Sequence, residues 1–299
     1  MFSEKSKGYF AILLSTFFYG WFGIFVKIIG SSIPIFYQSF TRNIVVAGIL
    51  ILFLTISHQG FRIRSLSDLY KILARSVFGF INITTALISF QRLSIGFAYI
   101  LFFAGLLIGS FIIGSVFNKE RIDKIKIVSL GVTLLGVIIA YAYRAQISGE
   151  YIYIFLAIVS GVAVAFWNVL SQFINKEISA TALNCYDAIL LFLLSLVASL
   201  IVGETWNMPV ISPQWLANLG LIVTFLFAGI LIPYGFRKVE VQLGSILMPL
   251  EIVFGVLLGY IFLKDAITLS LVLGCTLIII ASALPYVWDL RGSRRIRRQ

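Results

Sequence analysis

Ten long apolar runs separated by short polar segments make up most of the chain. Most of these runs approach the ~20 residues that a helix needs to cross the ~30 Å hydrocarbon layer of a membrane. Alternating segments of ~10 residues, typical of a transmembrane strand barrel, are not found. The pattern therefore predicts an all-α integral membrane protein with ten transmembrane helices. The runs extend over residues 8–29, 34–57, 72–91, 95–117, 127–143, 151–173, 182–203, 215–235, 243–263 and 266–288.

Composition agrees with a membrane environment. Hydrophobic residues make up 60% of the chain and charged residues 12%, and the mean hydropathy is +1.04. A soluble domain carries about 25% charged residues, so this chain has too few polar side chains to cover its surface in water. Helices are expected because lipid offers no hydrogen-bond partner to backbone groups.

The two halves of the chain resemble each other at an offset of 146 residues. Residues 92–101, RLSIGFAYIL, align with residues 238–247, KVEVQLGSIL, and residues 38–42, QSFTR, align with residues 184–188, NCYDA. Internal repeats with a substrate site between them are typical of secondary transporters. The expected organisation is a first five-helix repeat over residues 1–145, a second over residues 146–290 and a basic cytoplasmic tail over residues 291–299.

The distribution of basic residues predicts the orientation of the helices. If the N-terminus is cytoplasmic and the chain crosses ten times, 18 of the 23 lysines and arginines, Arg75 included, fall on the cytoplasmic side, and Arg42 lies inside a helix. The four on the opposite side are Lys27, Arg92, Arg144 and Lys264. Because cytoplasmic loops carry such an excess of basic residues, both termini are expected in the cytoplasm. The protein itself is expected in a cell (inner) membrane. With five crossings in each half, the repeat is predicted to be inverted.

The net charge of +11 and the arginine-rich tail at residues 291–298 agree with this orientation. Basic residues at the cytoplasmic face attract anionic lipid. A nucleic-acid site would need a folded domain to present the basic patch, and aromatic residues are not interleaved with these arginines. Membrane lipid is therefore an expected partner, and nucleic acid is not.

The sequence contains no recognisable catalytic or metal-binding constellation. The single histidine, His58, lies in a loop, and Cys185 and Cys275 lie inside predicted helices without CxxC spacing. Zinc sites, disulfide frameworks and Ser-His-Asp chemistry are therefore not expected. A GxxxxGK[ST] phosphate loop is also absent, so ATP is not the expected energy source. The chain is predicted not to be an enzyme and to hold no cofactor or metal.

Two acidic residues inside the predicted helices are candidates for function, because ionisable groups in a membrane often mark substrate or ion pathways. Glu251 is eight residues into the ninth run and follows Pro249. It is interpreted as a substrate contact or a carrier of a coupling proton; the alternative is a carboxyl held by hydrogen bonds for packing. Asp187, about five residues into the seventh run and near the cytoplasmic interface, is a second proton-coupling candidate, with a solvated side chain as the alternative.

Arg42 lies deep in the second run and is the only basic residue of the 23 that the pattern assigns neither to a loop nor to a helix end. Its planar guanidinium group can hold the carboxylate or phosphate of a substrate. The alternative is a structural pair with a protein carboxylate or with backbone carbonyls. The interpretation preferred here is a structural role together with a general electrostatic role at the mouth of a cavity, and the substrate-binding role stays open.

Short segments along the chain form a further pattern: KG at residues 7–8, FTRN at 40–43, FNKE at 117–120, PLE at 249–251 and FLKD at 262–265. Together they resemble the drug/metabolite transporter superfamily in its ten-helix form with two EamA-type domains. The resemblance covers nearly the whole chain. Phe103 stands where this family often has a proline, and Asp265 replaces the more usual glutamate.

This resemblance implies a secondary transporter that moves a small organic metabolite, an amino acid or related solute, by alternating access, with efflux as the expected direction. The protein would act on a small-molecule substrate as a monomer or a homodimer. By analogy, the first, third, fourth, sixth, eighth and ninth helices line a central cavity. The alternative is a transporter-like membrane protein with a structural or assembly role and no transport. The candidate substrate contacts, with Arg42 added, are Tyr19, Trp21, Asn82, Tyr99, Trp167, Asn168 and Glu251.

Overall fold

The computed structural model describes residues 3–59, 63, 65–142, 151–207 and 209–296, and this part of the chain contains eleven helices and no strand. It includes ten helical spans that are long and apolar enough to cross a membrane. The predicted all-α architecture with ten transmembrane helices is confirmed. Some sequence predictions concern positions outside the described residues: Arg62, Arg64, Arg144 and the boundary between residues 145 and 146.

Most helices agree closely with the predicted runs. The helices are α1 (Glu4–Ile29), α2 (Ile35–Ile56), α3 (Leu66–Arg92), α4 (Ile95–Asn118), α5 (Lys124–Ala142), α6 (Tyr151–Phe173), α7 (Ala180–Val202), α8 (Pro213–Phe236), α9 (Val241–Leu247), α10 (Leu250–Leu263) and α11 (Leu269–Ile296). α9 and α10 together form one span, Val241–Leu263.

The third helix begins earlier than the hydropathy pattern predicts. The Ser65 side chain accepts a hydrogen bond from the Asp68 N–H at 3.0 Å and caps the first turn, so α3 begins at Leu66. Arg75, predicted at the cytoplasmic side, is therefore the tenth residue of this helix and is fully buried. The predicted run began at residue 72 and placed Arg75 near the cytoplasmic end of the helix. Because α3 begins at Leu66, Arg75 lies deeper than predicted.

The ninth span is divided by a tight turn at Met248 and Pro249. Proline has no N–H group and cannot continue the helical ladder. Around it, the N–H groups of Met248, Glu251 and Ile252 bond to carbonyl oxygens three residues earlier, at 3.0–3.2 Å. The equivalent helix of the first half, α4, carries Phe103 and runs without a break. The turn places Glu251 in the first turn of α10.

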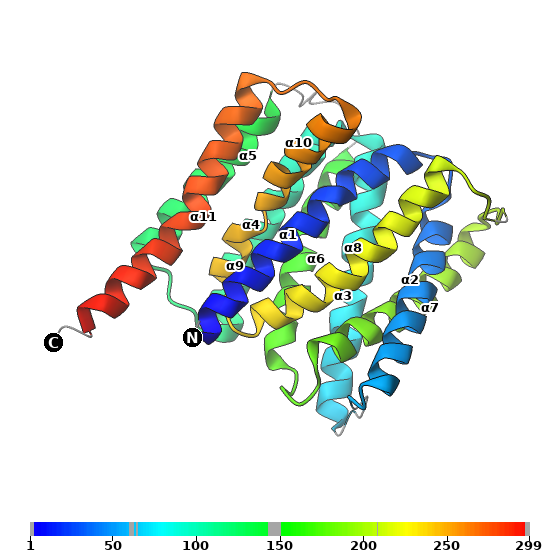
Figure 1. Cartoon of the computed structure of the whole chain (residues 1–299), viewed down its shortest axis with the longest axis horizontal. Coiled ribbons are helices and arrows are strands. Elements are labelled where there is room, and N and C mark those ends of the chain that lie inside the picture. Colours follow the sequence, from blue (N-terminus) through cyan, green and yellow to red (C-terminus); the bar gives the residue numbers. More distant parts are fainter. Residues whose placement is uncertain (1–2, 60–62, 64, 143–150, 208, 297–299) are drawn as a thin grey trace.

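Contacts between the two halves occur in symmetric pairs. Equivalent helices pack against each other, α2 against α7 and α5 against α11. α1 packs against α8 and α10, and its equivalent α6 packs against α3 and α4. A pseudo-two-fold axis in the membrane plane generates this pairing, in agreement with an inverted 5+5 repeat. Figure 1 shows the result, with α5 and α11 at one side of the molecule and α2 and α7 at the other.

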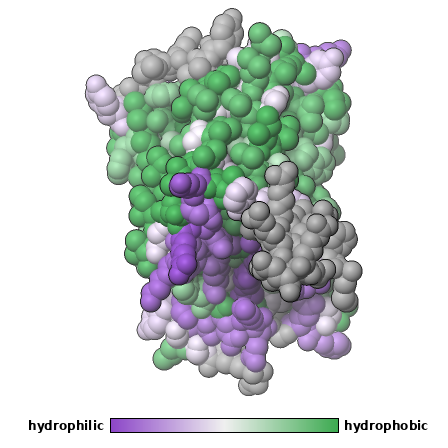
Figure 2. Space-filling view, turned by 90° about the vertical axis from the view of Figure 1, so that its left-hand side faces the viewer, coloured by the Kyte–Doolittle hydropathy of each residue, from purple (hydrophilic) through white to green (hydrophobic). Residues whose placement is uncertain are grey.

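Polar and apolar surface are separated along the helices. α1 begins and α11 ends on the same side of the bundle (Figure 1). On the face shown in Figure 2, apolar side chains cover the upper part and polar side chains gather toward the lower end. Leu52, Leu200 and Ile261 are examples of large apolar side chains exposed on the outer helices. An exposed apolar surface of this extent fits a protein surrounded by lipid.

Glycines allow α4 and α6 to approach each other closely. A Cβ atom on Gly161 would lie 2.0 Å from the Phe102 carbonyl oxygen and 2.5 Å from the Leu106 nitrogen. A Cβ atom on Gly105 would lie 2.4 Å from the Ile158 carbonyl oxygen. In lipid, close packing of this kind contributes strongly to helix association, because burial of apolar surface gives little driving force there.

The Gly161→Ala substitution is expected to destabilise the protein by about 1–3 kcal/mol, because the added methyl group forces α4 and α6 apart. Gly131→Ala in α5 is the matched control, since nothing lies within 4 Å of its Cβ position, and alanine is favoured over glycine in a helix by about 1 kcal/mol. Thermal unfolding of both variants in detergent measures the difference. Equal unfolding temperatures would contradict the close contact.

Candidate functional site

A cavity of about 100 Å³ lies between the two repeats. Its walls come from α1, α2, α3, α4, α6, α7, α8 and α10, so both repeats contribute to it. α2 and α7 are additional to the six helices that the family resemblance implied. The wall is largely apolar and aromatic with a few polar side chains, which is the usual lining of a site for a small organic molecule. We call it the central cavity.

The central cavity brings together most of the residues predicted from the sequence. Those that line it are Tyr19, Asn82, Tyr99, Trp167, Asp187 and Glu251. Trp21, Arg42 and Asn168 are not among its lining residues.

Aromatic side chains hold one another in place around this cavity. Tyr99 lies parallel to Tyr141, with ring centroids 5.4 Å apart, and is 4.9 Å from the Phe90 ring. Tyr19 meets Phe225 edge-on, with centroids 6.4 Å apart. Such contacts stabilise the rings beyond the area that they bury. The cavity therefore has firm aromatic surfaces on the α1, α3, α4 and α8 sides.

Glu251 is the chemically distinct member of the cavity lining. Its carboxyl group has no hydrogen-bond or ion-pair partner among the described residues. Its position in the first turn of α10 places it near the positive end of the helix dipole, which offsets part of the cost of a charge there. A carboxylate without a protein partner in an aromatic cavity is available to a ligand or a proton.

Asp187 has several partners and is not solvated. Its carboxylate forms an ion pair with Arg75, and accepts hydrogen bonds from the Ser76 hydroxyl at 2.7 Å and from the Trp167 indole N–H at 3.1 Å. Arg75 also donates through Nε to the Ser171 hydroxyl at 3.0 Å and lies over the Trp167 ring, 4.2 Å from its centroid. The arrangement connects α3, α6 and α7.

This ion pair corrects two interpretations of the sequence. Arg42 is not the only basic residue inside the helices, because Arg75 is buried there as well. Asp187 is only 5% exposed, which rules out the alternative of a solvated carboxylate in this structure. A buried charge needs a partner of opposite sign, and the two residues meet that need for each other.

Arg42 lies behind the wall of the central cavity. It is 1% exposed, and its guanidinium carbon lies 4.4 Å from the centroid of the Phe225 ring, which itself lines the cavity. Its Nε and Nη2 atoms are buried without a hydrogen-bond partner in the described part of the chain. The structural pair with a protein carboxylate is therefore not seen among these residues. Substrate contact by Arg42 stays a prediction.

Trp21 and Asn168 lie outside the cavity lining. Trp21 stacks on Phe25, with ring centroids 5.6 Å apart, and lies 4.8 Å from the Phe262 ring. Asn168 is fully buried in α6, next to the cavity-lining Trp167, and its side-chain amide atoms have no partner among the described residues. Adjacent residues of a helix point in different directions, which explains why only one of this pair reaches the cavity.

Two cavity-lining amides were missed in the sequence, Asn43 and Asn184. Asn43 donates to the Ser39 carbonyl oxygen at 2.8 Å, and Asn184 donates to the Phe225 carbonyl oxygen at 3.1 Å. Both lie in or beside the repeated segments at residues 38–42 and 184–188. Their polar character inside apolar runs was the available signal, and it was the same signal that identified Asn82.

A second cavity of about 290 Å³, which we call the outer cavity, extends from the central one toward one end of the bundle. The two cavities share Tyr19, Tyr99 and Glu251. The outer cavity is also lined by Lys27 and Asp265, which form an ion pair at 3.1 Å. These two residues lie where α1 and α10 end, so Glu251 borders a route toward that end of the bundle.

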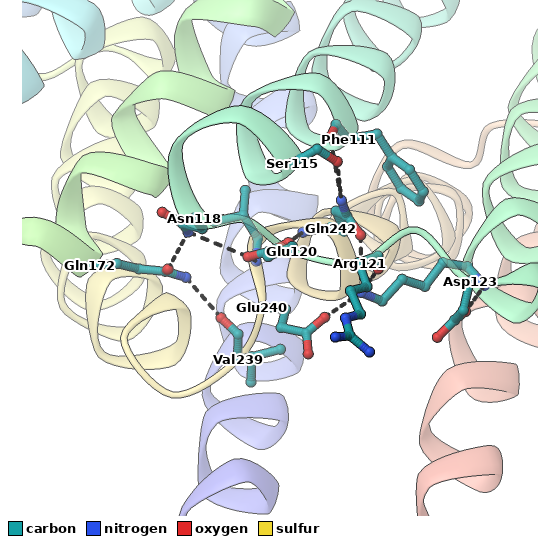
Figure 3. A network of polar contacts seen from close by, with 12 residues as sticks. Phe111, Ser115, Asn118, Glu120, Arg121, Asp123, Gln172, Val239, Glu240 and Gln242 are labelled. Carbon is teal, nitrogen blue, oxygen red and sulfur yellow. Dashed lines mark hydrogen bonds and ion pairs between the residues drawn. The ribbon is translucent and has the colours of Figure 1, made fainter.

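At the opposite end, a network of polar contacts joins helices of both repeats (Figure 3). Gln172 of α6 donates to the Phe236 carbonyl oxygen at 2.6 Å, and Gln242 of α9 donates to the Ser115 hydroxyl at 3.0 Å. Lys126 of α5 donates to the Gln242 side-chain oxygen at 3.0 Å and pairs with Glu240. We call this set the basal network, and it consists of Ser115, Asn118, Glu120, Lys126, Gln172, Glu240 and Gln242.

A further contact ties the start of α1 to the end of α8 at the basal end. Lys238 forms an ion pair with Glu4 and donates to the Tyr234 hydroxyl at 2.9 Å. Because both groups accept hydrogen bonds from the ammonium group, the pKa of Lys238 is raised above its ordinary value. Together with the basal network, this contact holds the two repeats together on the side where the chain begins.

The fold and the cavity define a class of protein. A multi-pass membrane protein in which two inverted repeats enclose a cavity has the architecture of secondary transporters. The model of the EamA-like transporter family matches the chain twice, at residues 6–142 and 151–287. The chain belongs to this family, and it is a membrane transporter of the drug/metabolite type.

A solved structure, titled only "Crystal structure of protein", is similar to the chain. The TM-score is 0.78 and the sequence identity 16%, over 94% of this chain and 97% of that one. At this identity the likeness supports the fold alone. No curated protein matches the chain in sequence.

The Asp187→Asn substitution is expected to destabilise the protein by about 3–5 kcal/mol, because it leaves the Arg75 charge buried without compensation. The double substitution Arg75→Met and Asp187→Leu is expected to cost less than either single one, since no charge then remains. Lys7→Gln is the control: it removes an exposed pair with Glu4, worth about 1 kcal/mol or less. Folded fraction and thermal unfolding in detergent measure these variants together with the single substitutions Arg75→Met and Asp187→Leu. Additive single effects would contradict the pairing.

Proposed function

We propose that the protein is a secondary transporter that moves a small organic metabolite, an amino acid or related solute, out of the cell by alternating access. The observation that carries this proposal is the central cavity between the repeats, with Glu251 unpaired in its wall. Aromatic surfaces suit an apolar portion of a solute, and a carboxylate suits a protonated amine. An amino acid with an apolar side chain offers both.

The balance of charge around the cavity supports an amine-bearing solute. Arg75 neutralises Asp187, so Glu251 is the unpaired charge among the described lining residues. A cation gains further from aromatic faces, which Tyr19 and Tyr99 provide beside Glu251 in both cavities. Arg42, behind Phe225, adds a positive field that favours a carboxylate on the opposite part of the solute.

Glu251 is also our candidate for proton coupling, ahead of Asp187. Asp187 is held by Arg75 and by two further hydrogen bonds, and a change of its protonation state would leave a buried arginine without a partner. Glu251 borders the outer cavity, which supplies a path for protons. The other titratable groups that line the two cavities are Tyr19, Tyr99, Tyr141, Lys27, Asp187 and Asp265.

Alternating access is supported by the difference between the two ends of the molecule. The outer cavity extends from Glu251 toward Lys27 and Asp265, whereas the basal network joins the repeats at the opposite end, where Gln242 contacts Ser115 and Lys126. We infer that the structure represents a state open toward the outer end. In the proposed orientation, the basal end is cytoplasmic, both termini are in the cytoplasm, and the membrane is the cell (inner) membrane.

The orientation predicts opposite labelling of two equivalent lysines. Lys119 and Lys264 are both exposed, and both are C-caps with a left-handed backbone at φ 55° and 56°. In a background with Cys185 and Cys275 replaced by alanine, an impermeant maleimide added to intact cells should label the Lys264→Cys variant. The Lys119→Cys variant should be labelled only after permeabilisation. Labelling of both from outside, or the reverse pattern, would contradict the orientation.

Transport is tested most directly with purified protein in proteoliposomes. Radiolabelled amino acids loaded inside should exchange with unlabelled solute outside, with saturable kinetics and above the rate of empty liposomes. Cells that express the protein should retain less of the same solute after preloading. Correctly folded protein that exchanges neither amino acids nor related metabolites would favour the alternative of a structural or assembly role.

The Glu251→Gln substitution is expected to lower the rate of transport about tenfold or more, because a charge-assisted hydrogen bond worth about 1.5–3 kcal/mol is lost. Glutamine keeps the size of the side chain but cannot exchange a proton, so the pH dependence of the remaining transport should also flatten. Glu177→Gln in the exposed loop after α6 is the control. A Glu251→Gln variant with full rate and unchanged pH profile would exclude the role.

A further inference from the structure

Two acidic residues occupy equivalent places in the two repeats. Glu120 follows Lys119, the C-cap of α4, and Asp265 follows Lys264, the C-cap of α10. Both lysines have a left-handed backbone, and the N–H of each acidic residue bonds to a glycine carbonyl oxygen six residues earlier, at 3.1 and 3.2 Å. The local structure is therefore the same at the two ends of the molecule.

Glu120 binds the start of the ninth span. Its two carboxylate oxygens accept hydrogen bonds from the backbone N–H groups of Val241 at 2.7 Å and Gln242 at 3.0 Å (Figure 3). N–H groups in the first turn of a helix have no partner within the helix, and a carboxylate there is favoured by the helix dipole as well. Glu120 therefore fastens the end of α4 to the beginning of α9 across the interface between the repeats.

Asp265 does not make the equivalent contact. The equivalent helix start is that of α4, where the N-cap Ser94 makes no side-chain capping bond and its hydroxyl oxygen is buried without a partner in the described part of the chain. Asp265 instead accepts from the Lys27 ammonium group at 3.1 and 3.3 Å, and both side chains are about half exposed. Gly96, in the first turn of α4, and Asp265 line the outer cavity together.

We propose that Glu120 and Asp265 are alternating latches of the two gates. In the state described here, Glu120 caps α9 and closes the basal end, while Asp265 is released and the outer cavity is present. In the opposite state, Asp265 leaves Lys27 and accepts hydrogen bonds from the first-turn amides of α4 and the Ser94 hydroxyl, while Glu120 releases α9. This inference rests on the proposed alternating access.

The hydrogen bonds gained at one helix start offset those lost at the other when the latches exchange. Hydrogen bonds from N–H groups to a carboxylate are stronger than those to neutral acceptors, and in each state one helix start has such bonds while the other is exposed to a cavity. Aspartate is one methylene shorter than glutamate, so the outer latch offers less reach than the basal one. The buried Ser94 hydroxyl, which lacks a partner here, supplies an additional donor at the start of α4. An unused donor at this position is understandable if its acceptor arrives only in the other state.

The test measures how open the outer cavity is. Val256 lines it, and the Val256→Cys variant, in the background without native cysteines, reports its exposure to an impermeant maleimide. Glu120→Gln weakens the basal latch, so labelling should slow about fivefold as the outward-open population falls. Asp265→Asn weakens the outer latch, so labelling should be unchanged or faster. Asp265→Glu, which keeps the charge, should restore a rate near that of the parent.

Asp123→Asn is the matched control. Asp123 also accepts from a backbone N–H at a helix start, that of Lys126 at 2.9 Å, but it does so within its own repeat. The Asp123→Asn variant should therefore label at the rate of the parent. Size-exclusion profiles verify folding, and Glu120→Asp replaces Glu120→Gln if the latter does not fold. Labelling needs no transported solute, so it separates this proposal from the identity of the substrate. A folded Glu120 variant that labels like the parent, or Glu120 and Asp265 variants that shift in the same direction, would overturn the latch.

Discussion

The lack of hydrogen-bond partners in a lipid bilayer is the constraint on which the rest of this structure depends. Every backbone polar group in the hydrocarbon layer must be bonded within the protein, and the described spans meet this requirement as helices. The ladder is interrupted at Met248 and Pro249, in a turn that borders the central cavity and is covered by neighbouring helices. Irregular backbone at membrane depth is tolerated where protein or a cavity surrounds it. The turn at Met248 and Pro249 therefore both interrupts the helix and places Glu251 in the first turn of α10.

The same constraint governs the charges. Arg75 and Asp187 are both buried, and they are accommodated because each compensates the other and because Ser76, Trp167 and Ser171 add hydrogen bonds to the pair. Pairs of this kind connect helices without adding net charge to the cavity. Glu251 differs, since its charge is not matched by a protein group among the described residues. The contrast separates a carboxylate that organises the bundle from one that is free to meet a solute or a proton.

Symmetry between the repeats describes how the molecule is assembled, and two carboxylates depart from it. The helix pairs between the repeats are equivalent, and so are the caps that precede Glu120 and Asp265. The contacts of these two carboxylates nevertheless differ, one bonded to backbone amides across the repeat interface and the other to Lys27. In the proposed alternating access the two repeats exchange these roles, and the same local structure in both repeats supports that proposal.

The sequence by itself determined the features that depend on linear patterns. Hydropathy predicted ten spans, and internal similarity predicted the repeat. Five crossings in each half predicted that the repeat is inverted, and short segments identified the family. Glu251 could be singled out because a carboxyl inside an apolar run is unusual wherever its helix faces. Polar residues after α2 concealed the true start of α3. Arg75, inside the predicted run from residue 72, was therefore placed near a helix end and not recognised as buried.

Only the tertiary structure decided which side chains meet. Arg75 and Asp187 are 112 residues apart in the chain, and no local pattern indicates that they form a pair. Arg42 lies behind Phe225, and Asn168 lies beside the cavity-lining Trp167 without lining the cavity itself. The reason is that a helix in lipid is apolar on its outer face as well as its inner one, so hydropathy carries little information about its rotation. That rotation is set by the glycine contacts and polar links between helices, which exist only after the two repeats have packed together.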